Sequence, residues 1–110
     1  MTNQLLMTLS DIATEAHVRI QQDFKHIDPI VGVSQNMRSS GIPADVMTID
    51  CLKSGKRIIL ILHDDTPDII SFQFAFRDKD PDKKFQAIPF AELTSQKLYD
   101  WISSYFSNAV

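Results

Sequence analysis

The sequence contains one cysteine, three glycines and no apolar run longer than five residues. Because Cys51 has no second cysteine to pair with, an intrachain disulfide is impossible and a secreted scaffold built on disulfides is excluded. Gly32, Gly41 and Gly55 are too few for a glycine-rich loop that cradles phosphate groups. The longest apolar run, residues 58–62, is far too short to cross a bilayer, so we expect no membrane partner.

Positive charge is also scarce, since 11 Lys and Arg stand against 14 Asp and Glu, for a net charge of -3 and a pI of about 5.4. This mild acidity gives no long-range attraction for a phosphate backbone, so no nucleic-acid partner is expected. The first residues lack the basic region and continuous apolar segment of a signal peptide, which makes a cytoplasmic location the simplest expectation.

A length of 110 residues predicts a single domain over residues 1–110. Apolar residues recur every three or four positions over residues 3–26, which predicts a first helix there, with a later start at Ser10 or Asp11 as the alternative. The last helix is expected over residues 95–106, with Thr94 as its N-cap. Helices at both ends of a short sheet define an α+β fold.

The segments between the helices predict an antiparallel meander of three or four strands. Strands are expected over residues 45–52, 57–63 and 69–77, and residues 85–88 form the optional fourth strand, at an edge. Gly55 lies in the turn between the first two strands, where a positive φ is available to it. Cys51 falls among alternating apolar residues and is predicted to be a small core side chain.

Residues 30–44 are the least regular part of the chain. Their small and polar residues predict a long internal loop, and a short strand over residues 30–33 is the alternative interpretation. Long loops in compact domains often carry function. We therefore predict that Asn36, Arg38 and Ile42 bind a protein partner.

An aromatic stripe, formed by Phe72, Phe74 and Phe76, alternates with polar residues along the third strand. Aromatic side chains on a sheet can stack on bases, but this alternation places the stripe on the core side. The order helix, three strands, helix resembles the double-stranded-RNA-binding domain in topology only, because the final helix carries one basic residue, Lys97.

The turn at residues 63–68 holds the densest group of candidate catalytic or metal-binding side chains, namely His63, Asp64, Asp65 and Asp68. Imidazole and carboxylate groups after a buried strand suit acid–base chemistry, or a divalent metal held by His63 and Asp65. One alternative is therefore a small metal-assisted hydrolase, with His26 as a further candidate. The simpler interpretation is a polar hairpin turn, and no cofactor is predicted.

The strand at residues 57–63 is apolar on both sides, so it requires cover on both faces of the sheet. Two helices side by side cover one face only. Either the helices lie on opposite faces, or a second copy covers the other face or an exposed edge. A homodimer meets this requirement most simply. The sequence thus favours a non-enzymatic protein-binding or regulatory module that acts as a homodimer, ahead of the hydrolase alternative.

Overall fold

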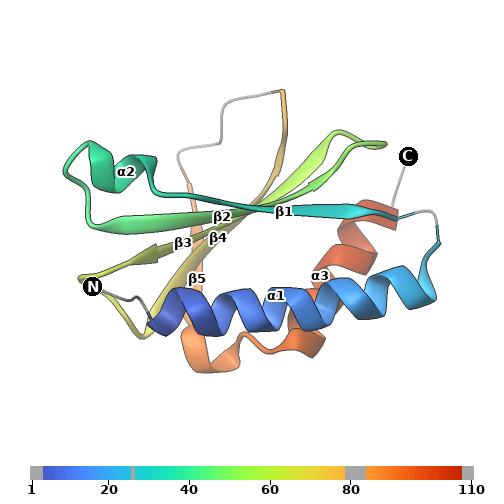
Figure 1. Ribbon diagram of the computed structural model, residues 1–110, viewed down its shortest axis with the longest axis horizontal. Coiled ribbons are helices and arrows are strands. Elements are labelled where there is room, and N and C mark those ends of the chain that lie inside the picture. Colours follow the sequence, from blue (N-terminus) through green and yellow to red (C-terminus); the bar gives the residue numbers. More distant parts are fainter. Residues whose placement is uncertain (1–3, 26, 79–83, 108–110) are drawn as a thin grey trace.

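The computed structural model describes residues 4–25, 27–78 and 84–107. Within these residues it has an α+β architecture with two long helices and five strands (Figure 1). In chain order the elements are α1 (Gln4–Asp23), β1 (Pro29–Ser34), α2 (Asn36–Ser39), β2 (Ala44–Cys51), β3 (Lys56–His63), β4 (Ile69–Phe76), β5 (Gln86–Pro89), the 3-10 helix η1 (Phe90–Glu92) and α3 (Ser95–Ser107).

The α+β fold predicted from the sequence is confirmed, with one strand more than expected. β2, β3 and β4 occupy the three expected strand regions, and β5 lies where the optional edge strand was expected. The additional strand is β1, within the segment predicted as a long loop, so the short-strand alternative is the one the structure has. Its apolar residues do not alternate and Gly32 interrupts them, which is why the pattern left this segment ambiguous.

Each strand pairs with the next in antiparallel fashion, so the sheet order is β1–β2–β3–β4–β5. One row of directly paired residues runs from Val31 through Ile49 and Ile58 to Phe74. Directly paired residues share a face of the sheet, and this row faces the helices. In the turn between β2 and β3, Gly55 has a φ of 73°, as its position predicted.

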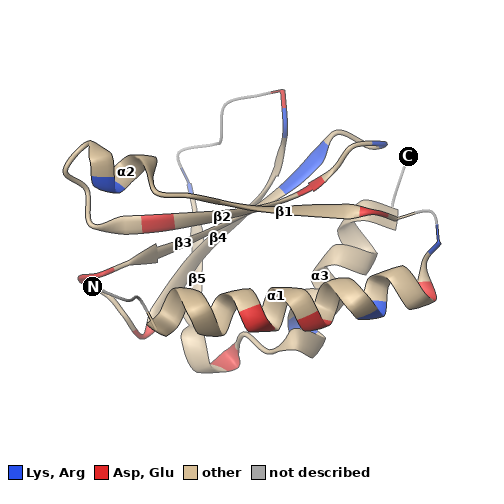
Figure 2. Ribbon diagram, in the orientation of Figure 1, with Lys and Arg blue, Asp and Glu red and all other residues tan. Residues whose placement is uncertain are grey.

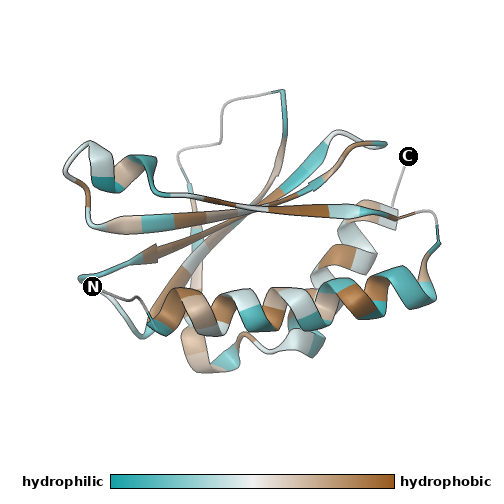
Figure 3. Ribbon diagram, in the orientation of Figure 1, coloured by the Kyte–Doolittle hydropathy of each residue, from teal (hydrophilic) through white to brown (hydrophobic). Residues whose placement is uncertain are grey.

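Both long helices lie on the same face of the sheet (Figures 1 and 3). α3 begins as predicted, because the backbone N–H of Lys97 donates to the Thr94 hydroxyl at 3.1 Å. Among the described residues, no helix is both long and apolar enough to span a membrane. The core between the helices and the sheet includes Leu9, Ala16, Ile20, Met47, Ile49, Cys51, Ile58, Leu60, Ile70, Leu98, Ile102 and Phe106.

The opposite face of the sheet is shielded largely by its own side chains. Ile59 lies there, paired with Thr48 and Gln73 on the neighbouring strands, and is only 7% exposed. Nearby, the Arg57 guanidinium binds the Asp50 carboxylate through two hydrogen bonds of 2.6 and 3.0 Å. The burial that β3 requires is therefore mostly achieved within one chain, and any unmet demand for cover lies elsewhere.

Candidate functional site

The four side chains of the turn at residues 63–68 do not gather around one point. The imidazole Nδ1 of His63 accepts a hydrogen bond from the backbone N–H of Asp65 and lies 3.7 Å from the Asp65 carboxylate. The Asp64 carboxylate is instead bound by Arg38, and Asp68 lines a separate apolar hollow. Among the residues that the structure describes, no three His, Cys, Asp or Glu side chains are grouped as metal ligands would be. His26 lies outside the described residues.

Arg38, predicted as part of a partner-binding loop, ties the β1–β2 connection to the sheet. Its guanidinium makes two hydrogen bonds to Asp45 at 2.7 and 3.0 Å and two to Asp64 at 2.9 and 2.8 Å. The Asp45 side chain is fully buried, so this ion pair neutralises a carboxylate inside the protein. Arg38 lowers the pKa of Asp64 below its ordinary value, while Asp64 and then Asp45 raise the pKa of Arg38. Asn36 and Ile42 remain exposed at the surface.

The two edges of the sheet differ in a way that bears on association. β5 has four residues, ends at Pro89 and leads into η1, all of which limit pairing with another chain. β1 has six residues, none of them charged (Figure 2). Ile30, Val31 and Val33 are exposed by 47%, 39% and 48%, so apolar side chains reach solvent on both faces of this edge. Edge strands of monomeric proteins are usually protected by charge, bulges or cover, and β1 has no charge of its own.

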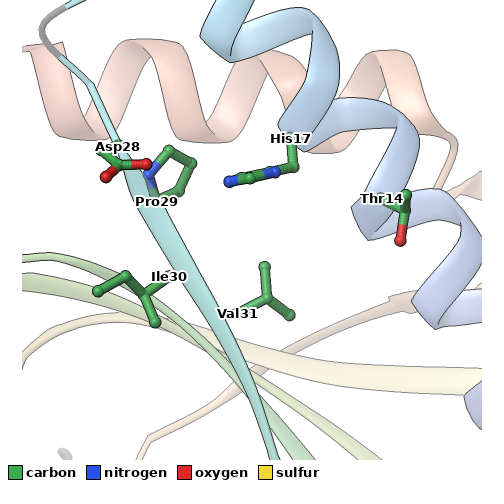
Figure 4. Close-up of a pocket in the computed structure, with 6 residues that line it drawn as sticks. All are labelled: Thr14, His17, Asp28, Pro29, Ile30 and Val31. Carbon is green, nitrogen blue, oxygen red and sulfur yellow. The ribbon is translucent and has the colours of Figure 1, made fainter.

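A groove lies between α1 and this edge strand, with a volume of about 380 Å³. His17 and Thr14 project into it from α1, and His17 points toward Asp28 and Pro29 at the start of β1 (Figure 4). Val31 forms part of its wall, so the groove and the exposed edge are one continuous surface. We call it the α1–β1 groove.

The side of α1 that faces this groove carries no Asp, Glu, Lys or Arg. Residues three and four apart lie on one side of a helix, so Thr14 and His17 belong to a longer stripe. The charged residues of α1 lie elsewhere, and one of them, Arg19, packs on the Tyr99 ring of α3 at 4.2 Å. The α1 stripe consists of Met7, Ser10, Thr14, His17 and Gln21.

A second hollow, of about 660 Å³, lies near the start of α1 and the adjacent ends of β4 and β5. It is mainly apolar, and Asp68 is the one charged residue among the described residues that line it, which include neither His63 nor Asp65. The residues around it are Leu5, Pro67, Asp68, Ile69, Pro89, Phe90 and Ala91.

The β1 edge is the surface that reasoning from the sequence missed. The available signal was a run of apolar residues without charge around Gly32, but its position at an edge depends on which strand pairs with which.

No protein-family model, curated protein or solved structure matches this chain.

Proposed function

We propose that this protein is a non-enzymatic protein-binding module that forms a homodimer through the β1 edge. The observation that carries the proposal is an uncharged six-residue edge strand whose Ile30, Val31 and Val33 side chains are exposed. Such an edge offers backbone N–H and C=O groups to a further strand, while its apolar side chains gain by leaving water.

A second copy of the chain is the partner that this surface fits best. Every copy carries a net charge of -3, so two copies repel unless they meet where acids are absent. Residues 29–34 and the α1 stripe lie side by side and include no charged residue, and Asp28, which lines the α1–β1 groove beside Pro29, lies at the end of this surface. In a two-fold dimer the same surface is used by both copies, so an uncharged apolar surface is complementary to itself.

The area of this surface is small for a stable interface between two copies. A strand of six residues is about 20 Å long, and the helix layer beside it gives a height of about 20 Å. The contact then covers roughly 400 Å² per copy in projection, at the low end for specific interfaces. We expect a concentration-dependent dimer with a dissociation constant in the micromolar range rather than the nanomolar range.

The non-enzymatic part of the proposal is supported by the side chains that the hydrolase alternative would use. Arg38 binds the Asp64 carboxylate, and Asp68 lines the hollow near the start of α1, which His63 does not line. A divalent metal that bound the folded protein would raise its melting temperature. We expect Zn²⁺ or Mg²⁺ to leave the melting temperature unchanged; an increase that disappears in His63→Ala would favour the hydrolase alternative.

Sedimentation equilibrium over a dilution series tests the homodimer directly. One chain has a mass of 12.5 kDa, so two copies give about 25 kDa. The apparent mass is expected to rise toward the dimer value as the concentration increases from about 1 to about 200 μM. A mass of 12.5 kDa across the whole series would show that the protein is a monomer and contradict the proposal.

A further inference from the structure

Gly32 stands at the centre of the exposed edge strand, and the fold of one chain gives no reason for a glycine there. Its φ is not among the positive values, which occur at Gly41 and Gly55 in the described residues. A Cβ built on Gly32 would lie 3.5 Å from the Thr48 hydroxyl, an ordinary contact. Glycine weakens a strand, and in a strand it often marks the close approach of another backbone.

We propose that two copies pair through antiparallel β1 strands centred on Gly32, so that the two sheets join into one of ten strands. This inference rests on the proposed homodimer and specifies how the two copies meet. Gly32 of one copy then lies opposite Gly32 of the partner subunit, on the two-fold axis.

The alternation of the strand restricts the pairing to a few registers. Val31 and Val33 face the helix layer, whereas Ile30 and Gly32 face away from it. In a continuous antiparallel sheet, directly opposed residues lie on the same face of the sheet. Each β1 residue must therefore lie opposite a residue of the partner that is an even number of positions away in the sequence. The two-fold axis then passes midway between two copies of the same residue.

Among these registers, the one centred on Gly32 uses the strand best. It places each Val31 opposite the partner's Val33, so the half-exposed valines cover one another on the helix side. It uses residues 30–34 and leaves Pro29, which has no backbone N–H to donate, outside the new ladder. The register centred on Val31 would instead place Pro29 opposite the partner's Val33.

Glycine at the axis also gives room to Ile30, which is 47% exposed on the face away from the helices. Diagonal neighbours across two antiparallel strands are close enough for long side chains to touch. With no side chain on either Gly32, each Ile30 can lie over the backbone at the axis and lose contact with water. This accounts for an exposed isoleucine beside a glycine that the single chain does not require.

The helices support the same arrangement. α1 runs alongside β1 (Figure 1), and Thr14 of α1 and Val31 of β1 both line the α1–β1 groove (Figure 4). A two-fold axis perpendicular to the sheet keeps both helix layers on one side, so the two α1 stripes face each other across the axis. Because these stripes hold no charged residue, the two helices can approach without burying an unpaired charge.

Disulfide trapping of the full chain tests the register. Directly opposed residues have Cα atoms about 4.5–5.5 Å apart, within the range that a disulfide spans. In Gly32→Cys the two new thiols therefore face each other and should cross-link under mild oxidation to a species of two chains. In Val31→Cys they are offset by two residues along the strand, which places their Cα atoms about 8 Å apart, too far for a disulfide.

A second pair of variants avoids changing Gly32. Chains carrying Val31→Cys and Val33→Cys, when mixed, should cross-link to each other far more than either does alone, because these positions are directly opposed. Leu52→Cys, at an exposed turn position, is the control for random collision, and the parent chain is the control for the buried thiol of Cys51.

Cross-linking of Gly32→Cys and of the mixed valine variants, well above Leu52→Cys, is the expected result. Strong self-linking of Val31→Cys, without linking of Gly32→Cys, would overturn the register but leave the homodimer intact. No cross-linking above the control in a protein that sediments as a dimer would overturn the β1 pairing and place the interface elsewhere. A monomeric mass for the parent would overturn the homodimer itself.

Discussion

Replacing Val33 with Lys places a charge next to the centre of the proposed interface while changing little in the single chain. Complete burial of a valine side chain contributes about 1.5–3 kcal/mol. Val33 is 48% exposed in one chain, so dimerisation can bury only about half of that, roughly 0.7–1.5 kcal/mol per side chain. The two-fold axis doubles the effect, to about 1.5–3 kcal/mol for each dimer.

A change of about 1.4 kcal/mol corresponds to a tenfold change in a dissociation constant. Val33→Lys is therefore expected to weaken the dimer by about 10- to 100-fold, before any cost of desolvating the ammonium group. A dimer with a dissociation constant of about 1 μM would then be largely monomeric below about 10 μM. The fold should be retained, because lysine is a common residue on protected edge strands.

Sedimentation equilibrium of both proteins over the same concentrations measures this shift. Leu52→Lys is the matched control, since Leu52 is also an exposed apolar residue but lies in the turn between β2 and β3. Circular dichroism verifies that each variant is folded. If the parent dimerises and Val33→Lys dimerises with the same dissociation constant, the reasoning that places β1 at the interface is refuted.

Three further predictions concern the fold and its ion pairs. Ile102→Ala removes a buried side chain of α3 and should lower the free energy of unfolding in urea by about 2–5 kcal/mol; a loss under 1 kcal/mol would contradict its place in the core. Tyr105→Phe removes the hydrogen bond that the tyrosine hydroxyl donates to the Ala75 carbonyl at 2.8 Å, and should cost about 1 kcal/mol in the same assay, while no change would indicate that this bond is not formed in solution. Because Arg38 lowers the pKa of Asp64 in the folded protein, the stabilisation it gives is complete above the ordinary value of 3.8 and is lost as pH falls through the folded pKa. Melting temperatures below pH 4 should thus fall less steeply for Asp64→Asn than for the parent, and identical slopes would argue against the ion pair.

Elements with a clear local pattern could be predicted from the sequence. The apolar stripe of α1, the alternation of β2 and β4 and the Gly55 turn each lie within a few consecutive residues, and each appears as predicted. The Thr94 cap is local in the same sense, because its hydroxyl binds a backbone N–H three residues away. Cys51 is buried in the core, as its alternating neighbours indicated.

The role of Arg38 depends on contacts that are distant in the sequence. Its polar neighbours indicated a surface loop, yet its guanidinium binds Asp45 on β2 and Asp64 beyond β3. Asp64 was predicted as part of a polar turn or a metal site, and its partner is 26 positions away. Charged residues give no periodic signal, so a pattern cannot tell which of them pair when the strands come together.

The number and kind of the main elements, and therefore the α+β fold, follow from the sequence alone, since they depend on local backbone preferences and on the period of the apolar residues. The sequence also located an unmet demand for burial, but at residues 58–62, where neighbouring strands and long side chains supply most of the cover. Only the tertiary structure decided that β1 is the unprotected edge, because an edge is defined by the order of strands in the sheet. That order places the exposed valines, Gly32 and the uncharged side of α1 on one surface.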